Sequence, residues 1–364
     1  MPLSSTVQLT ADIKTEALRL GFFACGMARA GHVSSEAEAR LRRWISQGGH
    51  ADMHYMQNNM DLRLDPRLLM PGTRSIICVA LNYAAAHRPP ANEYQLATYA
   101  LGQDYHDVVK QKLHQLAAFI QSRLSAPAAA AFSYRACCDS APLWERYWAE
   151  QAGLGWTGRN HQLIIPPMTD PQTGKTAPGG GTMFFLGELL VNVDLAYDAP
   201  MPNRCGTCHR CIDACPTGAL TLQTSNLKPQ TSNLKPHISN LKPQASNFNA
   251  TACLSYQTIE HRGPIATPYA KAMGDTIYGC DRCQQACPWN RFATPTTEPQ
   301  LQPRPELLAM TKADWHRLTV EDYRRLFKGS AVKRAKYEGL MRNIQAAAEN
   351  QPPSPDQDKL SELS

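Results

Sequence analysis

Two stretches in the N-terminal half of the chain carry apolar residues at helical spacing. Their apolar positions are Leu9, Ile13, Ala17 and Leu20 in the first stretch, and Val109, Leu113, Leu116 and Ile120 in the second. This spacing puts apolar side chains on one face, so it predicts a helix that begins at a capping box of Ser5 and Gln8 and another over 105–124. A third helix is predicted over 35–47, where two glycines end it.

Two short apolar runs predict buried strands. The run Ser75–Leu81 follows Pro71 and Gly72, and the run Phe184–Val191 is entered through the glycines at 179–181. Predicted helices therefore alternate with predicted buried strands, which is typical of a layered α/β domain. We place this domain at residues 1–197.

Length and composition limit the class of protein. The chain has 364 residues, of which 43% are hydrophobic, and its net charge is +6 at pH 7. This length suits two or three domains with cores of their own. No apolar run is long enough for a bilayer and residues 1–5 do not resemble a secretion signal, so we expect a cytoplasmic monomer with no membrane contact. Four cysteines are expected to be buried apolar residues in a reducing compartment: Cys25, Cys78, Cys137 and Cys138.

The other eight cysteines follow a pattern with a chemical meaning. Residues 205–216 read Cys-x2-Cys-x2-Cys-x3-Cys-Pro, the ligand run of bacterial ferredoxins that carry two [4Fe–4S] clusters. In such a run the first three thiolates bind one cluster and the fourth binds the other. Residues 280–288 supply Cys-x2-Cys-x3-Cys-Pro, and Cys253 is the only cysteine between the two runs.

Eight thiolates are enough for two cubane clusters. We assign the first cluster to Cys205, Cys208, Cys211 and Cys287, and the second to Cys215, Cys253, Cys280 and Cys283. Structural zinc is the alternative, because paired Cys-x2-Cys also binds zinc. Zinc sites rarely use a third cysteine at the same short interval followed by Cys-Pro, so the spacing favours clusters. We place a ferredoxin-like domain at 198–300.

A sequence repeat interrupts this second domain. From Thr224 the unit Ser-Asn-Leu-Lys-Pro recurs with a period of seven residues. A proline in every unit forbids a continuous helix, and one leucine per unit cannot form a coiled-coil seam. A partner-binding linker is one interpretation, but the composition favours a disordered insertion over 222–250.

Positive charge is concentrated near the C-terminus. Residues 311–345, predicted to be helical from Thr311, hold nine Lys or Arg and four Asp or Glu, an excess of +5. Such an excess suits either a solvated helical face or a surface that binds a polyanion. We place a short C-terminal helical segment at 301–345 and expect a disordered tail at 346–364.

Further stretches resemble a known family, the epoxyqueuosine reductases. The stretches that carry the resemblance are Arg63–Gly72, Tyr99–His106, Asp139–Arg146, Ala152–Gly158, Phe185–Leu190, both cysteine runs and Gly329–Ala331. The resemblance implies an α+β multidomain protein: an α/β reductase-like cobalamin-binding domain, a two-[4Fe–4S] ferredoxin-like domain and the helical segment. It also implies that the clusters pass electrons singly to cobalamin.

The resemblance implies a substrate and partners as well. In this family an epoxide on a modified base of the tRNA anticodon is reduced to an alkene with loss of water, which completes queuosine. The implied partners are the anticodon stem-loop of a tRNA and an electron donor that the sequence does not identify. Lys333, Arg334 and Lys336 are the residues that we expect to contact tRNA phosphates.

Individual residues take roles through the same resemblance. The family's proton donor corresponds to Asp139, and an acid is needed because clusters supply electrons only. From the residues alone, Asp139 and Ser140 ahead of Pro142 also resemble a helix N-cap, and Glu145 is a rival acid. The implied cobalamin contacts are Arg63, Asp104, Tyr105, Asp139, Asn160, His161, Ser255, Thr258, Tyr278 and Gly279.

Two other functions are open at this point. One is another cobalamin-dependent reductase, such as a reductive dehalogenase, and the other is a two-cluster electron carrier of the ferredoxin type. A carrier has no need of some 200 residues before its clusters. The Asp-x-His-x-x-Gly motif of base-off cobalamin enzymes is absent, so His106 is expected to be structural rather than a cobalt ligand.

Overall fold

A four-stranded sheet lies at the centre of the computed structural model, which describes residues 3–168, 176, 178–222 and 246–349. Its strand order is β1-β2-β7-β4, and every neighbouring pair is antiparallel. The strands are β1 (Ala24–Arg29), β2 (Ser75–Asn82), β7 (Phe184–Val191) and β4 (Tyr134–Cys137). The two central strands β2 and β7 confirm the predicted strands, whereas the edge strands β1 and β4 have no predicted counterpart.

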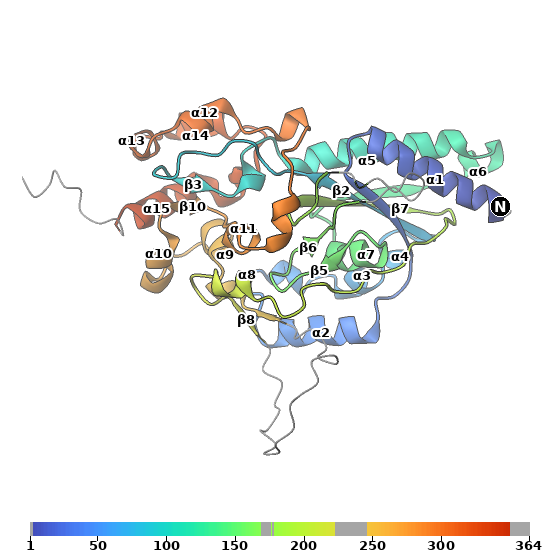
Figure 1. Ribbon diagram of the computed structural model, residues 1–364, viewed down its shortest axis with the longest axis horizontal. Helices are drawn as coiled ribbons and strands as arrows, with labels where there is room; N and C mark the ends of the chain where they lie inside the picture. Colours follow the sequence, from blue (N-terminus) through green and yellow to red (C-terminus); the bar gives the residue numbers. More distant parts are fainter. Residues whose placement is uncertain (1–2, 169–175, 177, 223–245, 350–364) are drawn as a thin grey trace, which may run out of the picture.

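Helices cover both faces of this sheet (Figure 1). On one face α1 (Leu3–Arg19) and α5 (Tyr105–Arg123) pack through buried residues such as Ile13 and Leu113. On the other face lie α2 (Ser35–Ser46), α3 (Met60–Leu64), α4 (Pro66–Leu69) and α7 (Glu145–Gln151). The predicted layers are present, but the strands between them run antiparallel. The predicted start of α1 is wrong, because α1 begins at Leu3 and Ser5 lies inside it.

A third core joins the middle of the chain to its C-terminal part. Here β3 (Gln95–Leu96) pairs in parallel with β10 (Thr276–Tyr278). Around this pair pack α9 (Leu254–Ile259), α10 (Thr267–Met273), α12 (Pro305–Ala309), α13 (Lys312–His316), α14 (Val320–Leu326) and α15 (Lys336–Ala348). Buried Trp315, Phe327 and Ile344 fill this core together with Tyr94. Residues on both sides of the proposed boundaries at 197 and 300 thus contribute to one core.

Short elements carry the cysteines and connect them to the sheet domain. The helices α8 (Arg210–Asp213) and α11 (Arg282–Gln285) lie side by side, and β5 (Trp156–Thr157) forms a hairpin with β6 (Leu163–Ile164). A further hairpin joins β8 (Leu220–Leu222) to β9 (Ser246–Phe248). The indole nitrogen of Trp44 in α2 donates to the Phe248 carbonyl at 2.7 Å, which anchors this hairpin.

The ends of two predicted disordered segments are ordered. Residues 222 and 246–250, assigned to the insertion, lie in β8, β9 and the start of a 3₁₀ turn (Ala250–Ala252), and α15 continues to Ala348. These boundaries were wrong because strand pairing and helix packing extend past the change in composition. The rest of the repeat and residues 350–364 lie outside the described residues. No helix among those described is long and apolar enough to cross a membrane.

Gly26 sets how closely α7 approaches the sheet. A Cβ atom at this position in β1 would collide with the Ala152 carbonyl at the end of α7 and lie 2.7 Å from Leu154 Cδ1. We expect Gly26→Ala to push α7 outward and to lower the free energy of unfolding by about 1–3 kcal/mol, the usual cost of overpacking. The denaturation midpoint of the cluster-loaded protein is the measurement.

Gly31→Ala is the matched control, because a Cβ atom there meets nothing within 4 Å. Equal midpoints for the two variants would contradict the close packing of α7 against β1.

Candidate active site

The cysteines of the first predicted cluster lie together. Burial, followed by the neighbouring thiols of Cys287, Cys205 and Cys208, raises the pKa of Cys211 to about 11. Cys287 comes from the second cysteine run, next to α11, while the other three surround the start of α8. The grouping therefore agrees with the assignment drawn from the spacing, and their role as ligands stays a prediction.

The remaining four cysteines form a second group. Burial raises the pKa of Cys253 to about 11, and Cys280 and Cys215 add to the effect. Cys283 lies near the same three thiols. Among the described residues, no three His, Cys, Asp or Glu side chains are arranged to hold a single metal ion. As for the first group, the role of these four cysteines as cluster ligands stays a prediction.

A buried arginine fastens the first cysteine run to the sheet domain. Arg159 follows β5 and is 7% exposed. Its guanidinium donates to the carbonyl oxygens of Cys208 and of Gly206, the latter at 2.7 Å. Carbonyls of a cysteine loop have few partners of their own, so a cationic donor in this place fixes the loop's position.

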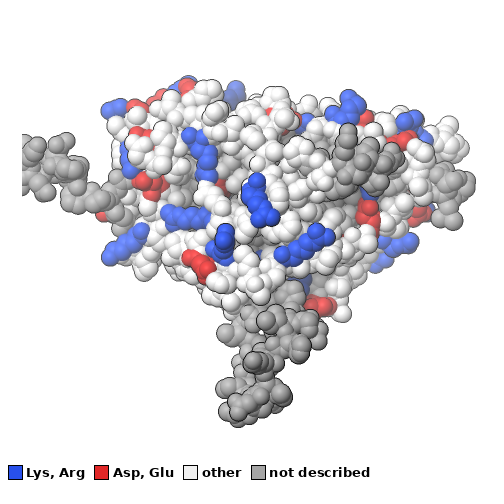
Figure 2. Space-filling model, in the orientation of Figure 1, with Lys and Arg blue, Asp and Glu red and all other residues white. Residues whose placement is uncertain are grey.

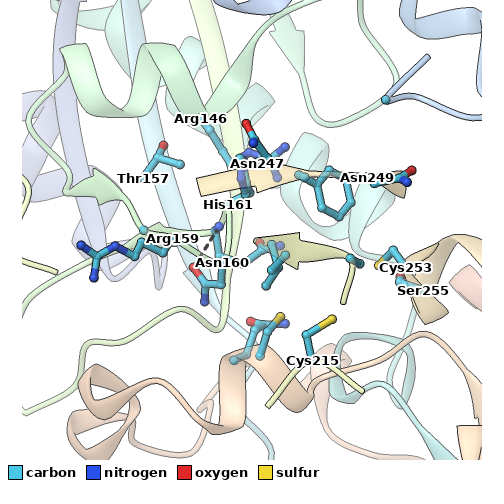
Figure 3. A pocket seen from close by; sticks show the side chains of 18 of the residues that line it. Arg146, Thr157, Arg159, Asn160, His161, Cys215, Asn247, Asn249, Cys253 and Ser255 are labelled. Atoms are coloured by element: carbon cyan, nitrogen blue, oxygen red, sulfur yellow. Dashed lines mark hydrogen bonds between the residues drawn. The ribbon is translucent and has the colours of Figure 1, made fainter. Parts of the chain in front are cut away.

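A cavity of about 1350 Å³ is lined by residues of the sheet domain and of the second cysteine group. Tyr99, Tyr105 and Phe185 line it, and so do Cys215 and Cys253. Figure 3 shows Asn160 and His161 projecting into the same space as these two cysteines. The volume exceeds the roughly 300–1,000 Å³ of ordinary small-molecule pockets, so it admits a large cofactor.

Four of the ten predicted cobalamin contacts line this cavity: Tyr105, Asn160, His161 and Ser255. Asn160 is 4% exposed and its Nδ2 has no hydrogen-bond partner. A buried donor without a partner costs free energy unless a ligand accepts from it, so this atom fits a cofactor with polar substituents. The residues therefore suit a large, partly polar group.

Three other predicted contacts lie within the third core. Thr258 and Tyr278 are fully buried. The Thr258 hydroxyl accepts from the Gly279 amide at 2.9 Å, and the Tyr278 hydroxyl donates to the Ala331 carbonyl at 2.7 Å. Their side chains have no exposed surface to offer a cofactor, because packing of the C-terminal segment covers them.

Asp139 stands at the centre of an acid cluster beside the cavity. Its Oδ2 accepts from the Tyr105 hydroxyl at 2.6 Å and lies 3.3 Å from His106 Nε2. His106 Nδ1 in turn lies 2.6 Å from Asp104 Oδ1, so the imidazole bridges two carboxylates. The Tyr105 ring stacks on Phe185 of β7 with centroids 4.1 Å apart, which fixes the hydroxyl.

The backbone at Asp139 rules out the N-cap alternative. Asp139 has a φ of 57°, the left-handed region that disfavours most residues, and its amide donates to the Glu145 carboxylate. The following helix, α7, begins only at Glu145 and has no side-chain cap at Trp144. The turn thus aims the Asp139 side chain at α5 rather than at a helix end.

The environment pushes the pKa values of these groups apart. The atoms packed around the Asp139 carboxyl group desolvate it and raise its pKa, although 59% of the side chain is accessible to solvent. Hydrogen bonds from His106 and Tyr105 and the charge of Arg146 outweigh this effect and leave the pKa below its ordinary value. Burial lowers the pKa of His106, but its bonds to Asp104 and Asp139 raise it to about 9. Burial and then the nearby Asp139 charge raise the pKa of Glu145 to about 8.

Sequence reasoning missed two members of this site. His106, expected to be structural, belongs to the acid cluster, and no signal beyond its place next to Tyr105 marked it. Glu188 lies in β7 and is fully buried, and burial together with the neighbouring Glu145 raises its pKa well above the ordinary value. A glutamate inside an apolar strand run was a visible signal, because carboxylates are rarely fully buried.

The predicted tRNA-contacting residues lie at the surface between α14 and α15. Lys333 and Lys336 are exposed, but Arg334 binds Glu260 with two bonds of 2.8 Å. Other basic residues of the segment are paired too, such as Lys312 with Asp275 at 2.7 Å. Figure 2 shows Lys and Arg spread over the visible face rather than in one patch.

The acid cluster, the cavity and the two cysteine groups define an oxidoreductase that binds iron–sulfur clusters. A family described as "4Fe-4S double cluster binding domain" matches residues 204–290, and one described as "Epoxyqueuosine reductase QueG, DUF1730" matches residues 63–140. An epoxyqueuosine reductase from Cellulophaga algicola is 40% identical over 332 residues, covering 91% of this chain and 95% of that protein. The chain belongs to the epoxyqueuosine reductase family.

Other comparisons agree with this assignment. The Escherichia coli epoxyqueuosine reductase is 36% identical over 351 residues, covering 95% of this chain and 82% of that protein. A crystal structure of epoxyqueuosine reductase with an epoxyqueuosine-modified tRNA-Tyr stem loop superposes with a TM-score of 0.76 at 24% identity. It covers 94% of this chain and 81% of that chain, and at this identity it establishes the shared fold.

The cysteine grouping gives a direct test. Cys253→Ala removes a thiol from the second group, so we expect one cluster to be lost or damaged and the iron content to fall from about eight per chain toward four. Iron analysis of anaerobically purified protein is the measurement. Cys25→Ala is the control, because Cys25 lies in β1 away from both groups. Full iron content in Cys253→Ala would refute the assignment.

Proposed function

We propose that this protein reduces epoxyqueuosine to queuosine in the anticodon of tRNA. The observation that carries the proposal is one cavity bordered both by the Asp139 cluster, through Tyr105, and by the second cysteine group. Reduction of an epoxide needs both electrons and protons at one place, and the cysteine group and the acid cluster are suited to provide them. The solved family member with a modified tRNA stem loop supports the same substrate class.

We further propose that the cavity holds cobalamin. Tyr105, Asn160, His161 and Ser255 are the residues that would hold it, with the Asn160 amide as a donor to a polar substituent. The chemistry that cobalamin supplies when bound is a cobalt centre that takes electrons singly and delivers them to carbon. The two cysteine groups, of which Cys205, Cys215 and Cys253 line the same cavity, are suited to hold the two clusters that would provide those electrons.

The chain's own residues must donate the proton. In the proposed reaction Asp139 protonates the oxygen that leaves carbon. Its lowered pKa makes it a carboxylate at neutral pH, so it must first take a proton from a neighbour. His106, whose pKa is raised to about 9, carries a proton at neutral pH and lies 3.3 Å from the Asp139 carboxylate. Tyr105 orients the acceptor oxygen.

Asp139→Asn tests the acid. The amide keeps size and hydrogen bonding but delivers no acidic proton, so we expect turnover to fall by a factor on the order of 10²–10⁴. Cluster and cobalamin content should be unchanged, as read from the visible absorption spectrum. Asp107→Asn, an exposed aspartate in the first turn of α5, is the control and should keep full turnover. Near-normal turnover of Asp139→Asn would move the acid to Glu145 or to water.

The exposed lysines test the tRNA surface. Arg334 is left intact, because its guanidinium is held by Glu260. We expect the double variant Lys333→Ala, Lys336→Ala to bind tRNA more weakly. The slope of log affinity against log salt concentration should fall by the equivalent of about one to two phosphate contacts. Affinity measured across a salt series is the readout. Lys312→Ala, whose charge is paired with Asp275, is the control. An unchanged salt slope would return both lysines to the solvated-face interpretation.

A further inference from the structure

Glu188 is a buried carboxyl group with nothing to satisfy it. It lies in the central strand β7 with 0% of its surface exposed, and neither carboxyl oxygen has a hydrogen-bond partner. An ionised carboxylate in such a place would cost several kcal/mol, so the group keeps its proton. Nothing in the packing of the sheet requires an acid here, since the neighbouring positions on this face are apolar.

The groups around Glu188 carry no positive charge. Cys78 of β2 and Cys137 of β4 lie directly opposite it across the sheet. Beyond burial, the charge of Glu145 at the start of α7 acts most strongly on its pKa, and that of Asp139, in the turn after β4, acts more weakly. Within the described part of the chain, no cation is among the charges that act on its carboxyl group. Its closest electrostatic partner is therefore another acid, Glu145.

Glu145 connects Glu188 to the acid cluster. One oxygen of its carboxyl group accepts the Asp139 amide, and the same carboxyl group interacts with Glu188 on the far side. Two carboxyl groups this close cannot both ionise, because like charges repel strongly in a medium of low polarity. Glu145 thus lies between Glu188 in the sheet and the backbone of Asp139, whose side chain belongs to the acid cluster.

The stoichiometry of the reaction requires a second proton. Converting the epoxide to an alkene breaks two C–O bonds, forms one C=C bond and releases the oxygen as water. The balance is two electrons, supplied through the clusters, and two protons. Asp139 holds one proton at a time, so a second one has to reach it or the leaving oxygen before the turnover is complete.

We propose that Glu145 and Glu188 form a buried proton store that refills Asp139 with the second proton. This inference rests on the proposed function. In the step itself the Glu145 O–H bond breaks and an O–H bond forms on the Asp139 carboxylate. Glu188 keeps its proton, so the negative charge left on the pair stays on Glu145 and not on the fully buried Glu188. The pair is then recharged from solvent through the exposed Asp139 side chain, which is 59% accessible.

Infrared spectroscopy tests the store without substrate. We expect wild-type protein at neutral pH to show the C=O stretch of a protonated, buried carboxyl group. Glu188→Gln should remove the contribution of Glu188 and leave at most that of Glu145, and Glu188→Met serves as a second variant of similar size if the amide does not fold. Asp139→Asn should keep the band, and so should Glu36→Gln, an exposed glutamate in α2. A band that keeps its full intensity in both Glu188 variants overturns the proposal.

The pH dependence of stability provides a second test of the Glu145–Glu188 pair. A folded-state pKa of about 8 for Glu145 means that the folded protein keeps a proton that the unfolded chain has lost above about 4.3. Stability therefore falls as the pH rises from about 4.3 to about 8. Without Glu188 the fall in stability should be shallower, because the folded protein then binds fewer protons relative to the unfolded chain. An equally steep fall in Glu188→Gln counts against a coupled pair.

Turnover decides whether the stored proton is used. We expect Glu188→Gln to lower turnover by about 10- to 100-fold and to move the loss of activity at high pH to a lower pH. Loss of the infrared band with an unchanged turnover and pH profile would overturn delivery to the reaction. If the wild-type protein does not reduce epoxyqueuosine at all, the proposed function fails, while the infrared result still decides whether the store exists.

Discussion

A buried polar network between β7 and the second cysteine run holds the whole site together. Asn290 Oδ1 accepts the Thr182 amide at 2.7 Å, and its Nδ2 donates to the Gln284 carbonyl at 2.6 Å. The Gln284 side chain accepts from the Tyr83 hydroxyl at 3.0 Å. Because each buried group has its partner, the network is rigid, and breaking one bond would leave a buried polar atom unpaired. Gly181 allows this contact, since any side chain there would collide with Asn290.

The network fixes the position of the second cysteine run relative to the acid cluster. A second link, the Asp281 carboxylate, accepts the amide and the hydroxyl of Thr98 at 2.7 and 2.6 Å. Thr98 begins the segment that leads to Asp104 and α5. The cysteine run is therefore attached to both sides of the cavity, to the strand that carries Glu188 and to the helix that carries His106. A rigid frame of this kind favours precise placement of reacting groups.

The sequence was most informative where one interaction dominates. A continuous apolar run determines a central strand, so β2 and β7 were predictable, and the cysteine spacing predicted which thiols lie near one another. The edge strand β4 contains Arg135 and exposed Tyr134, and only its partner β7 makes it a strand. The pairing of β3 with β10 involves two residues of each strand, and these lie some 180 positions apart in the sequence. No local sequence pattern could therefore predict it. The same holds for His106, whose role arises from two carboxylates that the fold brings to it.

The acid cluster derives its chemistry from the contrast between its carboxyl groups. Asp139 receives hydrogen bonds from Tyr105 and His106, which stabilise its charge and lower its pKa, whereas burial favours the neutral form of Glu145 and Glu188. Neighbouring acids in such different settings can have separate tasks, as when one carboxyl group stores a proton and the other presents it. In the proposed reaction the substrate sets the direction of transfer. An oxygen that leaves carbon becomes far more basic than a carboxylate, so it would take the proton from Asp139, and the Asp139 carboxylate would then accept the proton of Glu145. On this proposal the apolar side of the sheet contributes to the mechanism, because it keeps the second proton available at a pH where an exposed glutamate would have lost it.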